Sequence, residues 1–127
     1  MSYIDLLTQL KNAQAVGKER IKYSFSKLDE KIVSVLVENG FVAGFEKKGR
    51  GPKKFLDIIL AYEKDRGAID GLKFISTPSR RIYKKHQLIR PVRQGFGMAV
   101  VSTSQGIMTD KEVRKKKIGG QVLFEIW

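Results

Sequence analysis

Residues 102–112 of this 127-residue chain read STSQGIMTDKE, and they decide how its C-terminal half folds. The stretch opens with three small hydroxyl residues, which are typical of a turn. Thr109 and Glu112 then stand three residues apart, as in a capping box, where the hydroxyl and the carboxylate each accept a backbone N–H at the start of a helix. The spacing predicts a short helix after Thr109, and the cations at residues 114–117 suit its negative C-terminal end.

Two glycines follow this predicted helix. Gly119 and Gly120 are expected to end it, and Val122, Phe124 and Ile126 then alternate in a final apolar strand. Neither the glycines nor the hydroxyl turn carries a bulky side chain. The backbone of another molecule therefore has room to come close to both.

Working back toward the N-terminus, the apolar spacing and the turn residues predict an α+β fold. We expect a helix from Ile4 that stops at Gly17 and a second helix that is capped by Ser26 and ends at Asn39 and Gly40. The expected strands are residues 21–25, 41–48, 55–63, 68–76, 80–84, 97–103 and 122–126, with residues 86–95 as a connection. This order predicts two small lobes. Residues 1–66 would form a helix-strand-helix-strand-strand lobe, and residues 67–127 a mostly β lobe with one short helix.

Charge is the strongest bulk signal in the composition. The chain holds 25 Lys and Arg against 13 Asp and Glu, a net charge of +12. No acidic residue lies between Asp70 and Asp110, whereas seven Lys or Arg residues do. A merely soluble basic surface is one interpretation, but such a stretch repels itself unless a polyanion lies against it. We therefore favour a nucleic-acid partner.

Several other classes of function find little support. The chain has no cysteine, and His86 is its only histidine, so neither disulfides nor a familiar zinc site is expected. No apolar run approaches the ~20 residues that span a bilayer, and no secretory signal is visible, so we expect a cytoplasmic protein without a membrane partner. No nucleophile motif or phosphate-binding loop is present. The carboxylates stand mostly beside cations and are interpreted as solvated, so we expect neither an enzyme nor a cofactor.

Two basic segments are further candidates for contact with RNA. Tyr83 stands between Arg81 and Lys84, where its ring would stack on a base while the cations hold phosphates. A strand tyrosine with a buried ring is an equally good interpretation. Lys53 and Lys54 close a glycine-rich basic turn, which we include among the RNA-binding candidates.

The chain resembles the bacterial-type small-subunit ribosomal proteins of the eighth family along nearly its whole length. The most specific match is VSTSQGIMTDKE at residues 101–112, followed by Arg114 and by IGG at residues 118–120. RIYK at residues 81–84 and LTQLKNA at residues 7–13 are further matches. Weaker ones are SK at residues 26–27 and ENGF at residues 38–41.

This resemblance implies a function and a set of site residues. Family members bind the central domain of small-subunit ribosomal RNA, at an irregular helix, and help to assemble the subunit beside neighbouring ribosomal proteins. In some bacteria the same protein also represses the messenger RNA of its own operon, which is the alternative function. The implied RNA-binding residues are a turn with its neighbours and a secondary contact on the first helix: Ser102, Thr103, Ser104, Gly106, Tyr83, Gly119 and Gly120, and then Thr8, Lys11 and Asn12.

The chain departs from the family pattern at four places. Residues 3–5 read YID where an Asp-Pro is usual, and Lys11 replaces an arginine, which keeps the charge but loses the planar fork. Residues 77–79 read TPS where Arg-Pro-Gly is usual, and Gln121 stands where a glutamate is usual. An RNA contact at residues 77–79 is therefore left open.

Overall fold

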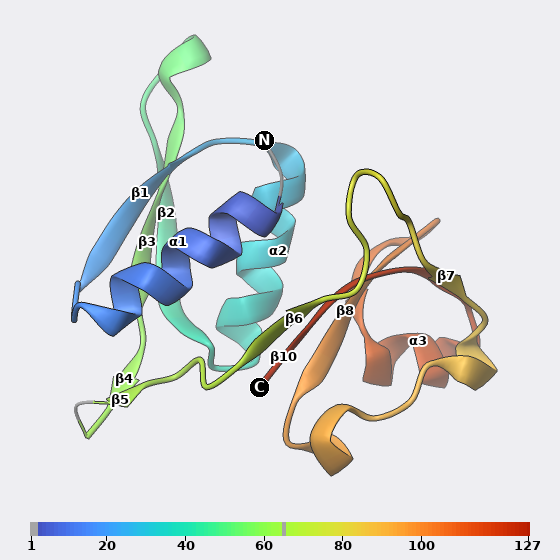
Figure 1. The fold of residues 1–127 in the computed structure, drawn as a ribbon. Coiled ribbons are helices and arrows are strands. Elements are labelled where there is room, and N and C mark those ends of the chain that lie inside the picture. The colour runs from blue at the N-terminus through green and yellow to red at the C-terminus, as the bar shows by residue number, and fades with distance from the viewer. Residues whose placement is uncertain (1–2, 65) are drawn as a thin grey trace. The chain divides into compact units, whose positions relative to one another are not determined.

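The structure is a computed structural model that describes residues 3–64 and 66–127. The chain forms two compact units: the N-terminal unit ends at Ile69, and the C-terminal unit begins at Asp70. The sequence suggested a division slightly earlier, between residues 66 and 67. Each unit has its own antiparallel sheet, and the mixed α+β class agrees with the prediction (Figure 1).

The N-terminal unit places two helices on one face of a three-stranded sheet (Figure 1). The strand order is β1-β3-β2, and all pairs are antiparallel. A short hairpin of two further strands follows the sheet. The elements are α1 (Tyr3–Ala15), β1 (Arg20–Ser24), α2 (Lys27–Glu38), β2 (Val42–Lys48), β3 (Phe55–Leu60), β4 (Tyr62–Glu63) and β5 (Arg66–Gly67).

Local sequence signals account for both helices. Leu6 and Leu10 of α1 are fully buried, as their spacing predicts. The chain leaves α1 through Gly17, whose φ of +76° favours glycine. The Ser26 hydroxyl accepts the backbone N–H of Asp29 at 3.1 Å and so caps α2.

A carboxylate lies buried at the centre of this sheet. Asp57 in β3 alternates with Leu56 and Ile58, which are buried toward the helices, so it faces the opposite side. It is only 3% exposed, which corrects the interpretation of the carboxylates as solvated. Arg20 and Lys48 each donate a hydrogen bond of 3.0 Å to its Oδ2. The Lys48 hydrogen bond is the main reason why the pKa of Asp57 lies below its ordinary value of 3.8.

Acid is expected to remove this contribution to stability. Because the pKa of Asp57 is lower in the folded chain, its stabilising effect is present above pH 3.8 and is lost as the pH falls through the lowered pKa. The thermal midpoint of Asp57→Asn should lie below that of the wild type at neutral pH, and the two should converge in acid. Burial raises the pKa of Asp29, so the effect of this residue on stability changes with pH in the opposite direction. The wild type and Asp57→Asn both retain Asp29, so it does not contribute to the difference between them. A difference in thermal midpoint that stays constant from neutral pH into acid would contradict the stabilising role of the Asp57 carboxylate.

The C-terminal unit is built around one central strand. Its elements are β6 (Leu72–Phe74), β7 (Tyr83–Lys84), β8 (Met98–Thr103), β9 (Gly106–Thr109), α3 (Asp110–Lys116) and β10 (Gly120–Ile126). β10 pairs with β8 on one side and with β6 and β7 on the other, and β9 extends the sheet beyond β8. The buried cluster between sheet and helix consists of Ile89, Val92, Ala99, Val101, Met108, Val113 and Val122.

The structure differs from the predicted elements at several places. Residues 106–109 form the strand β9, where the sequence suggested only a turn before the helix. The helix α3 ends at Lys116 and not at the glycine pair, and its C-cap residue Lys117 adopts the left-handed conformation with φ 57° and ψ 42°. The predicted strand 68–76 shortens to β6, and 55–63 divides into β3 and β4. Short 3-10 turns occupy the connections: η1 (Gly51–Lys53), η2 (His86–Leu88) and η3 (Val92–Gly95).

Within the described ranges, every helix is too short or too polar to cross a bilayer.

Candidate nucleic-acid interface

Three polar side chains form a row across the sheet of the C-terminal unit. Gln121 of β10 pairs with Tyr83 of β7 on one side and with Ser102 of β8 on the other. Directly opposed residues of antiparallel strands point to the same face. Tyr83 is 66% exposed, and the other two are partly exposed. The row therefore offers an aromatic ring, an amide and a hydroxyl together at one surface.

Gln121 was not among the site residues inferred from the sequence. Its place in the row depends on the register between β10 and β8, which local sequence does not specify. A bulge at Leu123 shifts this register, so that Val122 pairs with Val101 while Phe124 pairs with Val100. The only available signal was that residue 121 departs from the usual glutamate of the family.

The hydroxyl stretch forms the turn between β8 and β9. Ser104 and Gln105 are its two exposed central residues, and Gly106 closes it with a φ of +113°, a conformation that favours glycine. The Thr103 hydroxyl donates to the Gly106 carbonyl at 2.9 Å and accepts the Gln105 N–H at 3.0 Å. Thr103 thus stabilises the turn itself, whereas the exposed hydroxyl of Ser104 faces solvent. Ser102 belongs to the polar row.

A buried serine holds the strand that carries Tyr83. Ser76 is fully buried; its hydroxyl donates to the Val122 carbonyl at 2.5 Å and accepts the Ile82 N–H at 2.9 Å. The Val122 N–H in turn donates to the Ile82 carbonyl at 2.9 Å. This arrangement fixes the backbone directly before Tyr83 against β10. The exposure of Tyr83 excludes the interpretation of it as a strand tyrosine with a buried ring.

The glycine pair is required by packing inside the unit. A Cβ at Gly119 would lie 2.5 Å from the carbonyl oxygen of Lys84 and 3.0 Å from the Cα of Lys85. A Cβ at Gly120 would collide with the carbonyl oxygen of Ser102. The sequence suggested that these glycines end the helix and admit a ligand. The structure shows that helix α3 ends before them and that they let β7 and β8 approach β10, which brings the polar row together. An RNA contact at these glycines stays a prediction.

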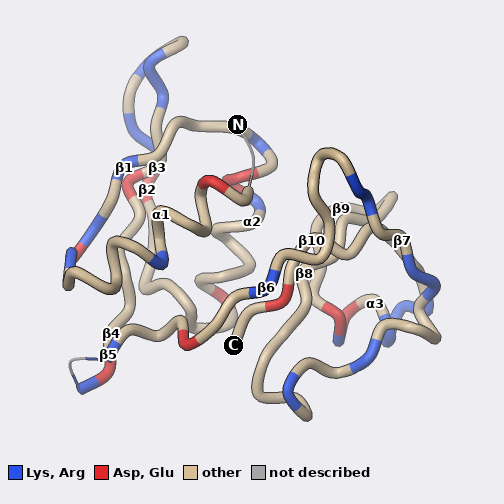
Figure 2. Tube along the Cα trace, viewed as in Figure 1, with Lys and Arg blue, Asp and Glu red and all other residues tan. Residues whose placement is uncertain are grey.

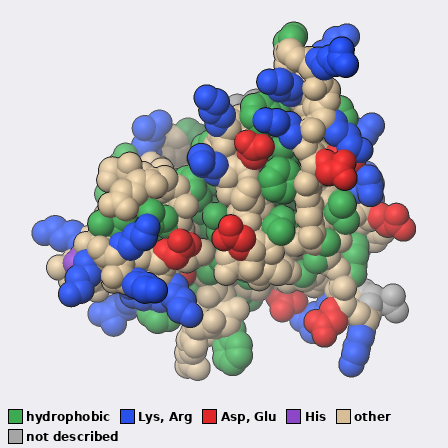
Figure 3. Space-filling model, turned by 180° about the vertical axis from the view of Figure 1, so that it is seen from behind, with side chains coloured by type: hydrophobic (Ala, Val, Ile, Leu, Met, Phe, Trp, Pro, Cys, Tyr) green, Lys and Arg blue, Asp and Glu red, His purple; other side chains and the backbone are tan. Residues whose placement is uncertain are grey.

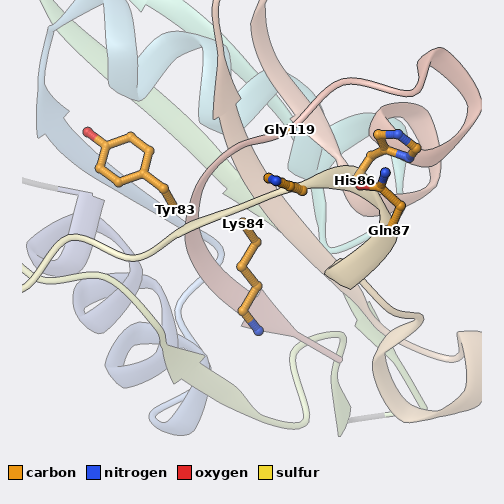
Figure 4. Close-up of a pocket in the computed structure, with 6 residues that line it drawn as sticks. Tyr83, Lys84, His86, Gln87 and Gly119 are labelled. Carbon is orange, nitrogen blue, oxygen red and sulfur yellow. The ribbon is translucent and has the colours of Figure 1, made fainter.

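Cations lie along β7, the strand that carries Tyr83, and at the end of α3 (Figure 2). Arg81, Lys84, Lys85 and residues 115–117 are exposed. Tyr83 and Lys84 extend from β7 in different directions (Figure 4). An open hollow of about 510 Å³ lies beside them, lined by Tyr83, Lys84, Lys85, His86, Gln87 and Gly119. A cationic hollow next to an exposed aromatic ring suits a phosphate and its base.

The helix α3 is tied to the sheet of the C-terminal unit by its N-terminal residues. The Glu112 carboxylate accepts the Thr109 N–H at 3.2 Å, and the Thr109 hydroxyl accepts the Glu112 N–H at 3.3 Å, which confirms the predicted capping box. Asp110 is buried and accepts bonds from the Ala99 N–H at 3.0 Å and from Arg114 at 2.7 Å. Asp110 therefore holds α3 to β8, and Arg114, which also donates to the Ile89 carbonyl at 3.3 Å, holds α3 to the connection between β7 and β8.

The remaining predicted residues lie in the N-terminal unit. Thr8, Lys11 and Asn12 share one side of α1 through their three- and four-residue spacing. The Thr8 hydroxyl donates to the Ile4 carbonyl at 2.7 Å, which leaves it as an acceptor. Lys53 and Lys54 are exposed at the β2–β3 connection.

Chemistry other than binding finds no geometric support in the described part of the chain. There, no three His, Cys, Asp or Glu side chains gather in a way that could hold a metal ion. Asp29, Asp57 and Asp110, the buried carboxylates, lie within hydrogen-bonded structural contacts.

Comparison with known proteins identifies the family. The model of the family described as ribosomal protein S8 matches residues 3–127. The chain is similar to the small ribosomal subunit protein uS8 of Sorangium cellulosum, with 39% identity over 97% of this chain and 95% of the relative. It is also similar to that of Rubrobacter xylanophilus, at 42% over 97% and 94%, and to that of Bordetella petrii, at 43% over 94% and 91%. The chain therefore belongs to the ribosomal protein S8 family: it is a ribosomal protein of the small subunit, a cytoplasmic ribonucleoprotein component of translation and not an enzyme.

Proposed function

We propose that the chain binds the central domain of small-subunit ribosomal RNA through the C-terminal unit and helps to assemble the subunit beside neighbouring ribosomal proteins. The observation that carries this proposal is the row of Tyr83, Gln121 and Ser102 next to the exposed turn at Ser104. Tyr83, Ser102 and Ser104 stand in a stretch with no acidic residue, from 71 to 109.

The arrangement suits recognition of an RNA shape. Hydroxyls and amides both donate and accept, as binding to the 2′-hydroxyls and base edges of an RNA minor groove requires. Tyr83 offers a ring face for an unstacked base. Exposed cations such as Arg81 and Lys84 supply affinity by displacing counterions, without reading sequence.

A secondary contact through α1 is part of the proposal. Thr8, Lys11 and Asn12 present an acceptor, a cation and an amide on one side of that helix. These groups suit a sugar–phosphate backbone, where Lys11 supplies charge without the bidentate geometry of arginine.

Ser104→Ala is expected to weaken binding to a central-domain transcript by about 1–3 kcal/mol, because a partner group on the RNA then loses its hydrogen bond. Filter binding at several salt concentrations measures this change. Ser24→Ala, which removes an exposed hydroxyl from β1, is the matched control and should bind as the wild type does.

Equal affinities of wild type and Ser104→Ala at matched salt would contradict the role of the turn. Chemical footprinting of the same complex should show protection in one irregular helix of the central domain. Protection scattered over the transcript, or equal affinity for random DNA, would contradict recognition by shape.

A further inference from the structure

The connection between β2 and β3 projects from the N-terminal unit as a cationic hairpin. Figure 1 shows the two strands extending beyond the helices, and Figure 3 shows Lys and Arg side chains gathered at this projection. Residues 47–56 contain five Lys or Arg residues and no acidic residue. We define the hairpin tip as residues 49–54.

The cations of the hairpin divide into two groups. At its base, Lys48 is bound to Asp57 at 3.0 Å, and Lys47 approaches Glu30 at 3.9 Å. At the tip, Arg50, Lys53 and Lys54 are exposed and form no ion pair with any described residue. The carboxylates therefore offset the positive charge at the base of the hairpin. The positive charge at the tip stays available to bind another molecule.

The conformation of the tip is fixed by its own residues. Gly49 has a φ of +88°, and a Cβ there would collide with the Lys53 carbonyl oxygen. Pro52 lies in the 3-10 turn η1, and the Phe25 N–H donates to the Lys54 carbonyl at 3.2 Å. The ammonium of Lys54 lies 5.9 Å from the centre of the Phe25 ring, within range of a cation–π contact. A tip held in this way loses little further freedom on binding.

We propose that the hairpin tip is a further RNA contact, in addition to those of the C-terminal unit and α1, which grips the sugar–phosphate backbone. This inference rests on the proposed function, from which it takes RNA as the ligand. Three unpaired cations on a fixed loop match phosphates, and no exposed aromatic ring stands among residues 49–54 to read a base. The contact should therefore add affinity and salt dependence but no sequence preference.

The absence of cysteine from the chain allows a direct test. An iron–EDTA group can be attached to a single cysteine in Lys53→Cys, in Ser104→Cys and in the control Lys31→Cys on α2. Each protein is bound to a transcript of the central domain, and radical cleavage of the RNA is mapped. We expect cleavage of the RNA from position 53 as well as from position 104, and only background from position 31.

The outcomes separate the two proposals. Cleavage from position 104 without cleavage from position 53 overturns the contact at the hairpin tip and leaves the proposed function intact. No cleavage from either position above the Lys31→Cys background overturns both. If the tip instead captures an acidic segment of a neighbouring protein, position 53 stays silent on RNA, which also overturns the proposal.

A salt titration supplies an independent measurement. Arg50→Gln with Lys53→Gln should lower the slope of log K against log salt by about 1.4–1.8, which corresponds to two lost phosphate contacts. The matched control, Lys18→Gln with Lys31→Gln, removes the same charge from exposed positions elsewhere on the unit and should leave the slope nearly unchanged. Equal slopes for the two double variants would show that only net charge matters.

Discussion

Phe124→Ala is expected to lower the free energy of unfolding by about 3–5 kcal/mol, because it leaves a cavity in a packed core. Phe124 is fully buried and lies in β10, where it pairs with Phe74 of β6 and with Val100 of β8. Such a loss is a large part of the ~5–15 kcal/mol that typically stabilises a domain. β10 also carries Gln121, so RNA binding should fall together with stability.

Phe96→Ala provides the matched control. The same side chain is removed, but Phe96 is 87% exposed at the end of η3, and the change should stay within about 0.5 kcal/mol. Urea unfolding followed by circular dichroism measures both variants, and hydrogen exchange of the β10 amides locates the loss. Similar effects of the two substitutions would contradict the central position of β10.

The helices were predictable because their signals are local. The apolar spacing of α1, the Ser26 cap of α2 and the capping box of α3 each lie within a few residues of the element they define. The end of α3 was not predictable in this way. A glycine is the usual residue in a left-handed cap, yet Lys117 adopts that conformation here, since both glycines are needed two and three residues later against β7 and β8.

The strand β9 and the polar row depend on pairing between distant segments. Residues 106–109 begin with a glycine at the close of a turn and are extended only because they pair with β8. The sequence indicated the chemical types at Tyr83 and at the hydroxyl turn. It does not predict the bulge at Leu123, which sets the register that brings Gln121 between Tyr83 and Ser102.

The buried carboxylates show a second limit. Asp57 is surrounded in sequence by apolar residues, and its partners Arg20 and Lys48 come from two other strands. Composition alone cannot tell such a residue from a solvated one. The burial of Asp57 depends on the strand order β1-β3-β2, which places β3 in the centre of the sheet.

Gly120→Ala is expected to reduce both stability and RNA affinity. The new Cβ would collide with the backbone carbonyl of Ser102, which cannot yield as a flexible side chain would, so β8 and β10 must separate. We expect a loss of about 1–3 kcal/mol in the free energy of unfolding, the usual cost of overpacking. Because the separation displaces Ser102 from Gln121, affinity for the central-domain transcript should fall as well.

Two comparisons make this result decisive. Gly44→Ala in β2 meets no atom within 4 Å of the new Cβ and should change the free energy of unfolding little. Ser104→Ala should reduce affinity alone, since its exposed hydroxyl supports no packing. If Gly120→Ala kept full stability by urea unfolding yet lost RNA binding, the glycine would serve the approach of the ligand and not the packing of β8 against β10.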